Sequence, residues 1–195
     1  KTIAKRPCFL CEQNRPKEQM TKAVDKNFTL LVNPFPIMPQ HFTIPLNNHR
    51  PQSIGINYGE MYKLLKAYPT LTVFYNGPKC GASAPDHMHF QAIASGTLPL
   101  QTEWPRLCRD ADTIVTRDDK NAIVAIRGFA VPIFAIRCTD TTIGEQLFKQ
   151  LYSTLPMHGG DTEPMMNILA WCDGEEFVSV IIPRKHHRPN CYRRH

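Results

Sequence analysis

The sequence predicts an α+β protein built from two half-modules, each an antiparallel sheet with one packed helix. Short apolar runs with strand-like alternation come in pairs, and one segment in each half carries apolar residues at helical spacing. The order strand, strand, helix, strand, strand occurs twice along the chain, without detectable residue identity between the copies. We therefore expect two related halves fused into one unit.

The first half begins with two short strands joined by a Pro-rich turn. Its helix is expected over residues 57–67, with Asn57 as the cap and Glu60 three residues further on. The apolar side of that helix carries Tyr58, Met61, Tyr62 and Leu65. Four strands are expected in this half, at residues 28–32, 41–45, 70–75 and 87–94.

The second half repeats the pattern after a Pro- and charge-containing connector. A helix is expected over 142–155, and Asp173-Gly174 is a strong turn signal between the last two strands. Strands are expected at residues 121–126, 130–137, 167–172 and 177–182. The division predicted is a catalytic half (1–100), a connector (101–120) and a second half with a basic tail (121–195).

One stretch of the first half alternates polar and apolar residues. From Asp86 to Ile93, a strand would place His87, His89 and Gln91 on one face and apolar residues on the other. Neutral imidazole is a nucleophile near pH 7, and a carboxamide donates a hydrogen bond to a phosphoryl oxygen without adding charge. The strip therefore suits covalent attack on phosphorus, although a His-X-His pair is also compatible with a surface pair or a metal site.

Small residues between Asn76 and Pro85 precede this strip. A loop of this kind leaves backbone N–H groups free to bind phosphate. The segments Tyr75-Asn76-Gly77, Gly81-Ala82-Ser83 and His87-Met88-His89-Phe90-Gln91 together resemble the signature of the histidine-triad superfamily. The resemblance is to the transferase and phosphorylase branch, which includes galactose-1-phosphate uridylyltransferase, dinucleoside polyphosphate phosphorylases and GDP-hexose phosphorylases.

The resemblance extends upstream to Asn33–Pro45, which is similar to the segment that forms the nucleoside pocket in this superfamily. It implies that Asn33, Phe35 and Pro36 contact the nucleoside. It also implies a duplicated, histidine-triad-like architecture, in agreement with the repeated pattern.

The resemblance implies a two-step reaction. His89 would attack the α-phosphorus of a nucleotide sugar (GDP- or UDP-hexose) or a dinucleoside polyphosphate, and phosphate or a sugar phosphate would accept the nucleotide. Gln91 would hold a non-bridging oxygen, and His87 would assist. Hydrolases of the superfamily usually have a third His in place of Gln91. Because Gln cannot activate water, we expect transfer, with a nucleotide hydrolase as the alternative.

Further substrate contacts are expected from the loop and the basic tail. Asn76, Ser83 and Lys79 are candidates in the loop, although Ser83 lies one residue further from His87 than in the usual phosphorylase pattern. Arg184 and Lys185 are candidates in the tail. Solvated surface positions are the alternative for Lys79 and the tail.

Cys8 and Cys11 form a Cys-X-X-Cys pair of the kind that binds zinc. Uridylyltransferases complete such a pair with two histidines, and the matching positions are His49 and His87. This implies a structural Cys2His2 zinc site, with two reduced thiols as the alternative. His41 is a further candidate ligand or a packing residue. No organic cofactor is expected.

Composition limits the other function classes. The chain has 195 residues, seven cysteines, a net charge of +6 and a pI near 9.0. No apolar run is long enough to span a membrane, and the odd cysteine count suggests a reducing cytoplasm. The charge suits a polyphosphate substrate, and no motif favours nucleic acid, so a zinc-stabilised nucleotide- or RNA-binding module is the non-enzymatic alternative. The chain begins with Lys1, which suggests a fragment or a processed product, and relatives suggest a homodimer.

Overall fold

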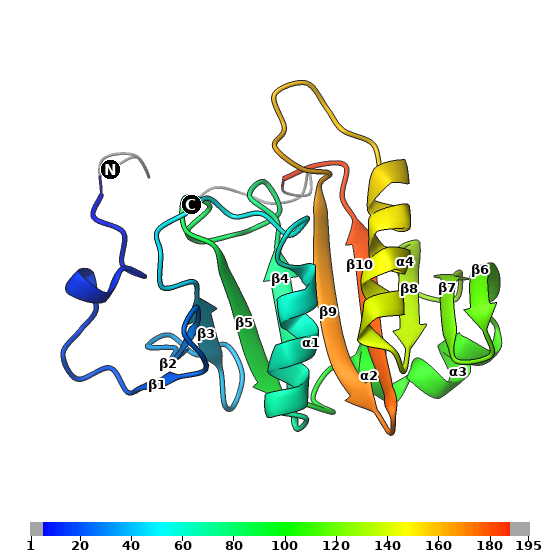
Figure 1. Ribbon diagram of the computed structural model, residues 1–195, viewed down its shortest axis with the longest axis horizontal. Coiled ribbons are helices and arrows are strands. Elements are labelled where there is room, and N and C mark those ends of the chain that lie inside the picture. The colour runs from blue at the N-terminus through cyan, green and yellow to red at the C-terminus, as the bar shows by residue number, and fades with distance from the viewer. Residues whose placement is uncertain (1–5, 188–195) are drawn as a thin grey trace.

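Ten strands form one continuous antiparallel sheet in the computed structural model, which describes residues 6–187 (Figure 1). The strand order is β1-β2-β3-β5-β4-β9-β10-β8-β7-β6. The strands are β1 (Thr21–Ala23), β2 (Thr29–Val32), β3 (Phe42–Pro45), β4 (Leu71–Asn76), β5 (His89–Ala94), β6 (Asp112–Asp118), β7 (Asn121–Ile126), β8 (Ile133–Cys138), β9 (Met166–Asp173) and β10 (Glu176–Pro183). The predicted α+β class is confirmed.

The two halves meet where β4 pairs with β9 at the centre of the sheet. Val73 lies opposite Ala170 and Asn76 lies opposite Asn167, so the first half and the second half share backbone hydrogen bonds. The predicted β9–β10 hairpin is present, and Gly174 supplies the positive φ of 61° that its turn needs. Each half therefore completes the sheet of the other.

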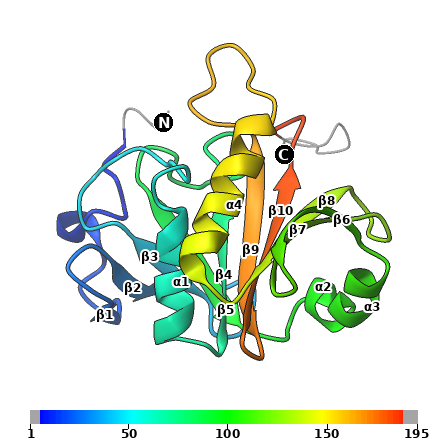
Figure 2. The same cartoon turned by 45° about the vertical axis from the view of Figure 1, so that its right-hand side comes forward.

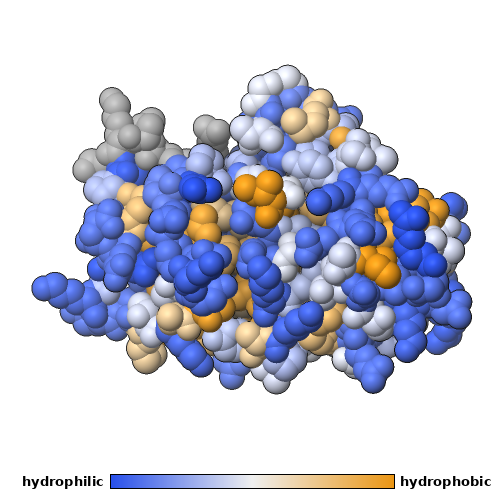
Figure 3. All heavy atoms as spheres, in the orientation of Figure 1, coloured by the Kyte–Doolittle hydropathy of each residue, from blue (hydrophilic) through white to orange (hydrophobic). Residues whose placement is uncertain are grey.

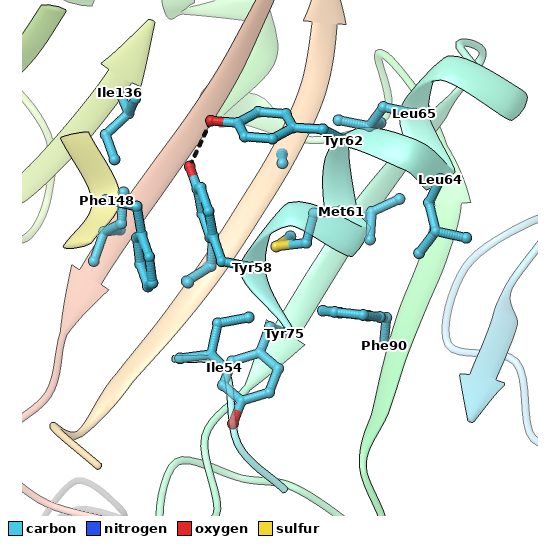
Figure 4. Close-up of a cluster of buried hydrophobic side chains, with 14 of the residues drawn as sticks. Ile54, Tyr58, Met61, Tyr62, Leu64, Leu65, Tyr75, Phe90, Ile136 and Phe148 are labelled. Atoms are coloured by element: carbon cyan, nitrogen blue, oxygen red, sulfur yellow. Dashed lines mark hydrogen bonds between the residues drawn. The ribbon is translucent and has the colours of Figure 1, made fainter. Parts of the chain in front are cut away.

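Two helices cover one face of the sheet, α1 (Tyr58–Ala67) and α4 (Thr141–Thr154), one from each half (Figure 2). They pack directly on one another, because the ring of Tyr58 stacks on Phe148 with centroids 3.8 Å apart (Figure 4). Gly144 permits this approach, since a Cβ there would lie 2.5 Å from the Tyr62 hydroxyl and 2.6 Å from Cys138 Sγ. The face of the molecule seen in Figure 3 is mostly hydrophilic, with small apolar patches.

The opposite face is covered differently in the two halves. Over the second half, α2 (Pro99–Thr102) and α3 (Trp104–Arg109) pack against β7, β8, β9 and β10 through Trp104, which meets Trp171 edge to face. Over the first half, α2 reaches this face through Gln101, which donates to Thr72 of β4 at 2.9 Å. On β5 the fully buried Phe90 and Ala92 point to the α1 side, so His89 and Gln91 point to the side opposite α1.

Several elements differ from the sequence expectation. The strand predicted at 87–94 begins at His89, so His87 lies in the preceding turn and does not share a strand face with Gln91. The segment expected to connect the halves contains α2, α3 and β6; β6 is exposed along almost its whole length and so lacks an apolar pattern. Asn57 lies at the start of α1, but its side chain donates to the Ser53 carbonyl and does not cap the helix.

A buried carboxylate also links the halves. Glu163, in the loop before β9, accepts a hydrogen bond from the Tyr75 hydroxyl at 2.6 Å and from the Ile54 amide at 2.8 Å. Its side chain is removed from water, and this burial raises the pKa of the Glu163 carboxyl above its ordinary value. No helix among residues 6–187 is long and apolar enough to cross a membrane.

Gly144→Ala should destabilise the protein, because the added methyl group collides with Tyr62 and Cys138. We expect a loss of about 2 kcal/mol in the free energy of unfolding, measured by urea denaturation, despite the better helix propensity of alanine. Gly159→Ala is the matched control, since a Cβ at Gly159 meets open space. Equal stability of the two variants would contradict this account of the α1–α4 contact.

Glu163→Gln should change the pH dependence of stability. The raised pKa means that the folded state holds this proton more tightly, so the wild type loses unfolding free energy as pH rises through the interval between the ordinary and the raised value. The glutamine variant can keep both hydrogen bonds. Because glutamine does not titrate, the unfolding free energy of this variant does not fall over the same pH interval. Urea unfolding from about pH 4 to 8 should therefore show the wild type weakening relative to Glu163→Gln. Parallel pH profiles would count against a raised pKa.

Candidate active site and metal cluster

His89, the first residue of β5, is the residue that the sequence predicts as the nucleophile. Its Nδ1 lies 2.8 Å from the carbonyl oxygen of His87. A carbonyl can only accept, so Nδ1 carries the proton and Nε2 carries the lone pair. Nε2 is buried and has no hydrogen-bond partner among the described residues. Burial lowers the pKa of His89, which keeps the ring neutral and its lone pair available.

The backbone of His89 is held by the buried side chain of Gln52. The Gln52 amide oxygen accepts from the His89 amide at 2.8 Å, and its NH2 group donates to the carbonyls of His89 and Asn76, both at 3.0 Å. Asn76 ends β4 and His89 starts β5, two residues beyond the last pair of these strands, Phe74 and Gln91. Gln52 thus bridges the strands where they separate. Sequence reasoning missed Gln52, because no local pattern marks its role.

Gln91 is oriented by His41, just before β3. The Ile37 amide donates to Nδ1 of His41 at 3.3 Å, so Nε2 of His41 carries the proton. That Nε2 lies 2.7 Å from the amide oxygen of Gln91 and donates to it. The NH2 group of Gln91 is therefore turned away from His41. His41 is accordingly an orienting residue for Gln91 and lies outside the metal cluster that the sequence considered for it.

A cavity of about 580 Å³ opens on the same side of the sheet. It brings together Asn33 and Phe35 from the β2–β3 turn, Ser83 from the loop, and Gln91 from β5. Asn33 braces the turn, because it accepts from the Phe35 amide at 2.9 Å and donates to Thr43 at 3.2 Å. Exposed apolar side chains stand at the rim, with Phe35 84% and Ile37 77% exposed.

Five of the expected contact residues do not line this cavity: Pro36, Asn76, Lys79, Arg184 and Lys185. Pro36 is exposed in the turn and does not line it, although its neighbour Phe35 does. Lys79 pairs with Asp161 of the second half and lines a separate pocket of about 330 Å³. In the loop between β4 and β5, Ala84 packs on Leu10, and this contact anchors the neighbouring Ser83.

The four candidate metal ligands meet at one point. The ligand atoms of Cys8, Cys11, His49 and His87 all lie within 4.8 Å of one another. Cys8 Sγ is 3.2 Å from His87 Nδ1, and Cys11 Sγ is 3.2 Å from His49 Nδ1. Ligand atoms around a tetrahedral zinc ion are roughly 3.3–3.8 Å apart, given Zn–S and Zn–N bond lengths. The arrangement and the donor types therefore fit a four-coordinate metal.

In both histidines, the ring nitrogen that faces away from the cysteines also has an oxygen atom nearby. His87 Nε2 donates to the Leu46 carbonyl at 2.7 Å, which leaves Nδ1 without a proton. His49 Nε2 is 3.9 Å from the Asp86 carboxylate. A carbonyl or carboxylate partner at the second ring nitrogen is typical of metal-bound histidine. His87, outside the strand, thus belongs to the cluster, and His89 two residues later shares its strand face with Gln91, which lines the cavity.

A row of polar side chains runs from β4 into the second half. Asn167 on β9 donates to Asn76 at 2.7 Å and to the Cys80 carbonyl at 2.8 Å, and Arg184 donates to Asn167 at 2.6 Å. Arg184 is half-buried at the end of β10, whereas Lys185 is exposed. Sequence reasoning missed Asn167, because an asparagine in an apolar strand carries no motif.

Comparisons with known proteins show which proteins this chain is similar to in sequence and fold. The family model described as a domain of unknown function, DUF4922, matches residues 1–94. Protein APA1 of Saccharomyces cerevisiae is 27% identical over 160 residues, which are 72% of this chain and 49% of that protein. Yeast Ap4A phosphorylase Apa2 in complex with Ap4A superposes with a TM-score of 0.53 at 20% identity, over 83% of this chain and 58% of that chain. The chain therefore shares its fold with Apa2.

The fold is also similar to that of a DUF4931 family protein from Bacillus cereus, with a TM-score of 0.57 and 16% identity over 85% of both chains. The resemblance to the phosphorylase branch of the superfamily is thus confirmed. The chain spans about half the length of the curated relative that it matches.

Proposed function

We propose that this chain carries a nucleotidyl-transfer site that cleaves a dinucleoside polyphosphate by phosphorolysis. The observation that carries the proposal is the buried Nε2 of His89, which has no hydrogen-bond partner among the described residues and lies on the same strand face as Gln91, a residue that lines the cavity. The names of the similar proteins support the substrate class, because Apa2 is an Ap4A phosphorylase with a structure in complex with Ap4A. Nucleotide sugars of guanine or uracil are the second substrate class that we consider.

In the first step, Nε2 of His89 forms a bond to the α-phosphorus and the bond to the bridging oxygen breaks. The leaving polyphosphate departs with that electron pair and takes a proton from solvent. The ring then carries a positive charge, which the Nδ1–H donation to the His87 carbonyl stabilises. In the second step an oxygen of inorganic phosphate forms the new P–O bond, and the N–P bond breaks to restore neutral His89.

Gln91 favours transfer over hydrolysis. Its amide oxygen accepts from His41, so its NH2 group is the end available to a phosphoryl oxygen. A carboxamide has no proton acceptor that could activate water near neutral pH. We propose that the covalent intermediate therefore persists until phosphate arrives. The nucleoside would occupy the cavity of about 580 Å³, a volume in the usual range for small-molecule sites.

We also propose that the Cys8, Cys11, His49 and His87 cluster holds a structural zinc ion. Four protein ligands leave no open position, as in structural zinc sites. Phe9 and Leu10, between the two cysteines, line the nucleoside cavity, and His87 precedes His89 by two residues. The ion would thus hold one wall of the cavity and the turn before the nucleophile, without touching substrate.

A covalent adduct tests the reaction. Ap4A, GDP-glucose, UDP-glucose and ADP-glucose are each incubated with the protein without acceptor, and the intact mass is recorded. We expect an AMP adduct with Ap4A that phosphate discharges, and no adduct in His89→Ala, because no other lone pair replaces Nε2. His158→Ala, an exposed histidine of the second half, is the control and should form the adduct. An adduct retained in His89→Ala would overturn the assignment.

Loss of the metal should weaken nucleoside binding. Cys8→Ser is expected to lower the zinc content and to reduce adenosine affinity about tenfold, because the wall that carries Phe9 and Leu10 loses its anchor. Elemental analysis and calorimetric titration with adenosine measure the two effects. Cys108→Ser, a part-buried cysteine outside the cluster, should change neither. Full zinc content in Cys8→Ser would exclude Cys8 as a ligand.

A further inference from the structure

Asn76, Asn167 and Arg184 form a chain of hydrogen bonds that crosses from the first half to the second. Arg184 Nη1 is 2.6 Å from Asn167 Oδ1, and Asn167 Nδ2 is 2.7 Å from Asn76 Oδ1. Asn76 and Asn167 are paired residues on neighbouring strands, so their side chains share one face. Phe74 shares that face as well and stacks on His41, the partner of Gln91. This row of hydrogen-bonded side chains thus lies on the face of the sheet that carries His89.

The chemistry of the end groups permits only one orientation of the two amides. A guanidinium can only donate, so the Asn167 oxygen must face Arg184. The carbonyl of Cys80 can only accept, so the Asn167 NH2 group must face Cys80, and it donates there at 2.8 Å. The same NH2 group meets Asn76, which must then accept through its oxygen. The NH2 group of Asn76 is consequently turned away from β9, toward the side on which β5 and His89 lie.

We propose that Asn167 and Arg184 are positioning residues that set the direction of the Asn76 amide, so that its NH2 group faces the phosphate attacked by His89. This inference rests on the proposed function and adds the second half of the chain to the reaction. Asn76 would contact the phosphoryl oxygen, and the other two residues would act through it.

The direction of an amide matters greatly next to an anion. An NH2 group stabilises the negative charge that builds up on the phosphoryl oxygens, whereas a reversed amide presents its own oxygen and repels them. A free asparagine side chain can adopt either direction. Arg184 and Cys80 prevent reversal, because a turned Asn167 would place donor against donor and acceptor against acceptor. The direction of the Asn76 amide is therefore fixed before substrate binds. We call the hydrogen-bonded row of Arg184, Asn167 and Asn76 the relay.

Asn167→Asp is the sharpest test. Aspartate keeps its size and its bond to Arg184 but cannot donate to Asn76, so the Asn76 amide should reverse to donate to the new carboxylate. We expect adduct formation with Ap4A to slow about 100-fold, the scale for losing a donor to a developing oxyanion. Asn167→Asp also loses the donation to the Cys80 carbonyl, so a purely structural role predicts a lower free energy of unfolding and weaker adenosine binding together with the slower reaction, whereas the relay predicts a slower reaction with adenosine affinity unchanged. A rate within about twofold of wild type would overturn the relay.

A double-mutant cycle separates action through Asn76 from direct contact of Arg184 with substrate. Arg184→Met removes the donor and should slow the adduct about fivefold to tenfold, less than Asn167→Asp, because Cys80 still directs Asn167. In an Asn76→Ala background the same change should have no further effect. If the two effects multiply, Arg184 contacts substrate directly and the relay is wrong. Arg127→Met, an exposed arginine of the second half, controls for loss of charge.

A binding measurement keeps the relay testable without the covalent reaction. AMP and adenosine differ by the phosphate, so the ratio of their affinities by calorimetry reports the phosphate site alone. We expect AMP to bind more tightly than adenosine to wild type, and this ratio to fall about tenfold in Asn167→Asp while adenosine affinity is unchanged. If wild type forms no adduct but shows this pattern, the proposed reaction fails and the relay stands. An unchanged ratio, or wild type that binds both ligands equally, overturns the relay.

Discussion

The candidate site depends on one buried amide, the side chain of Gln52. Three short hydrogen bonds from this group fix the backbone of His89 and the end of β4 at the point where the two strands part. With the His89 backbone fixed, its ring can reach the His87 carbonyl, and that bond settles which nitrogen carries the proton. A residue outside the strand thus helps to set the protonation pattern of the proposed nucleophile.

Around this point, the polar side chains are oriented by hydrogen-bond partners that can only donate or can only accept. A main-chain carbonyl directs His89, a main-chain amide directs His41 and through it Gln91, and a guanidinium directs Asn167. None of these partners changes its hydrogen-bonding role near neutral pH. The site is therefore preorganised mainly by backbone and by one permanent charge, which is a stable way to hold neutral side chains in defined directions.

Much of this could be predicted from sequence, because the relevant signals are local. Helical spacing gave α1 and α4, the Asp173-Gly174 turn gave the last hairpin, and the alternation after Asp86 placed His89 and Gln91 on one face. The resemblance grouped the four candidate metal ligands, which the structure brings together. Gln52, Asn167 and the direction of Gln91 could not be predicted, because they depend on contacts between distant segments. The exposed strand β6 lacked an apolar pattern, and His87 left the strand because the turn that carries it faces Cys8 and Cys11.

The central position of β4 has a consequence for how the chain is made. Asn76 finds its partner Asn167 only 91 residues later. At roughly 5–20 residues per second, synthesis leaves the outer edge of β4 without its neighbour for about 5–20 s. That edge carries Val73 and Tyr75, both fully buried in the finished protein, and unpaired apolar edges invite association with other chains. The nascent first half is therefore the stage at which this protein most needs protection from aggregation, and a fragment ending near residue 94 would keep that exposed edge permanently.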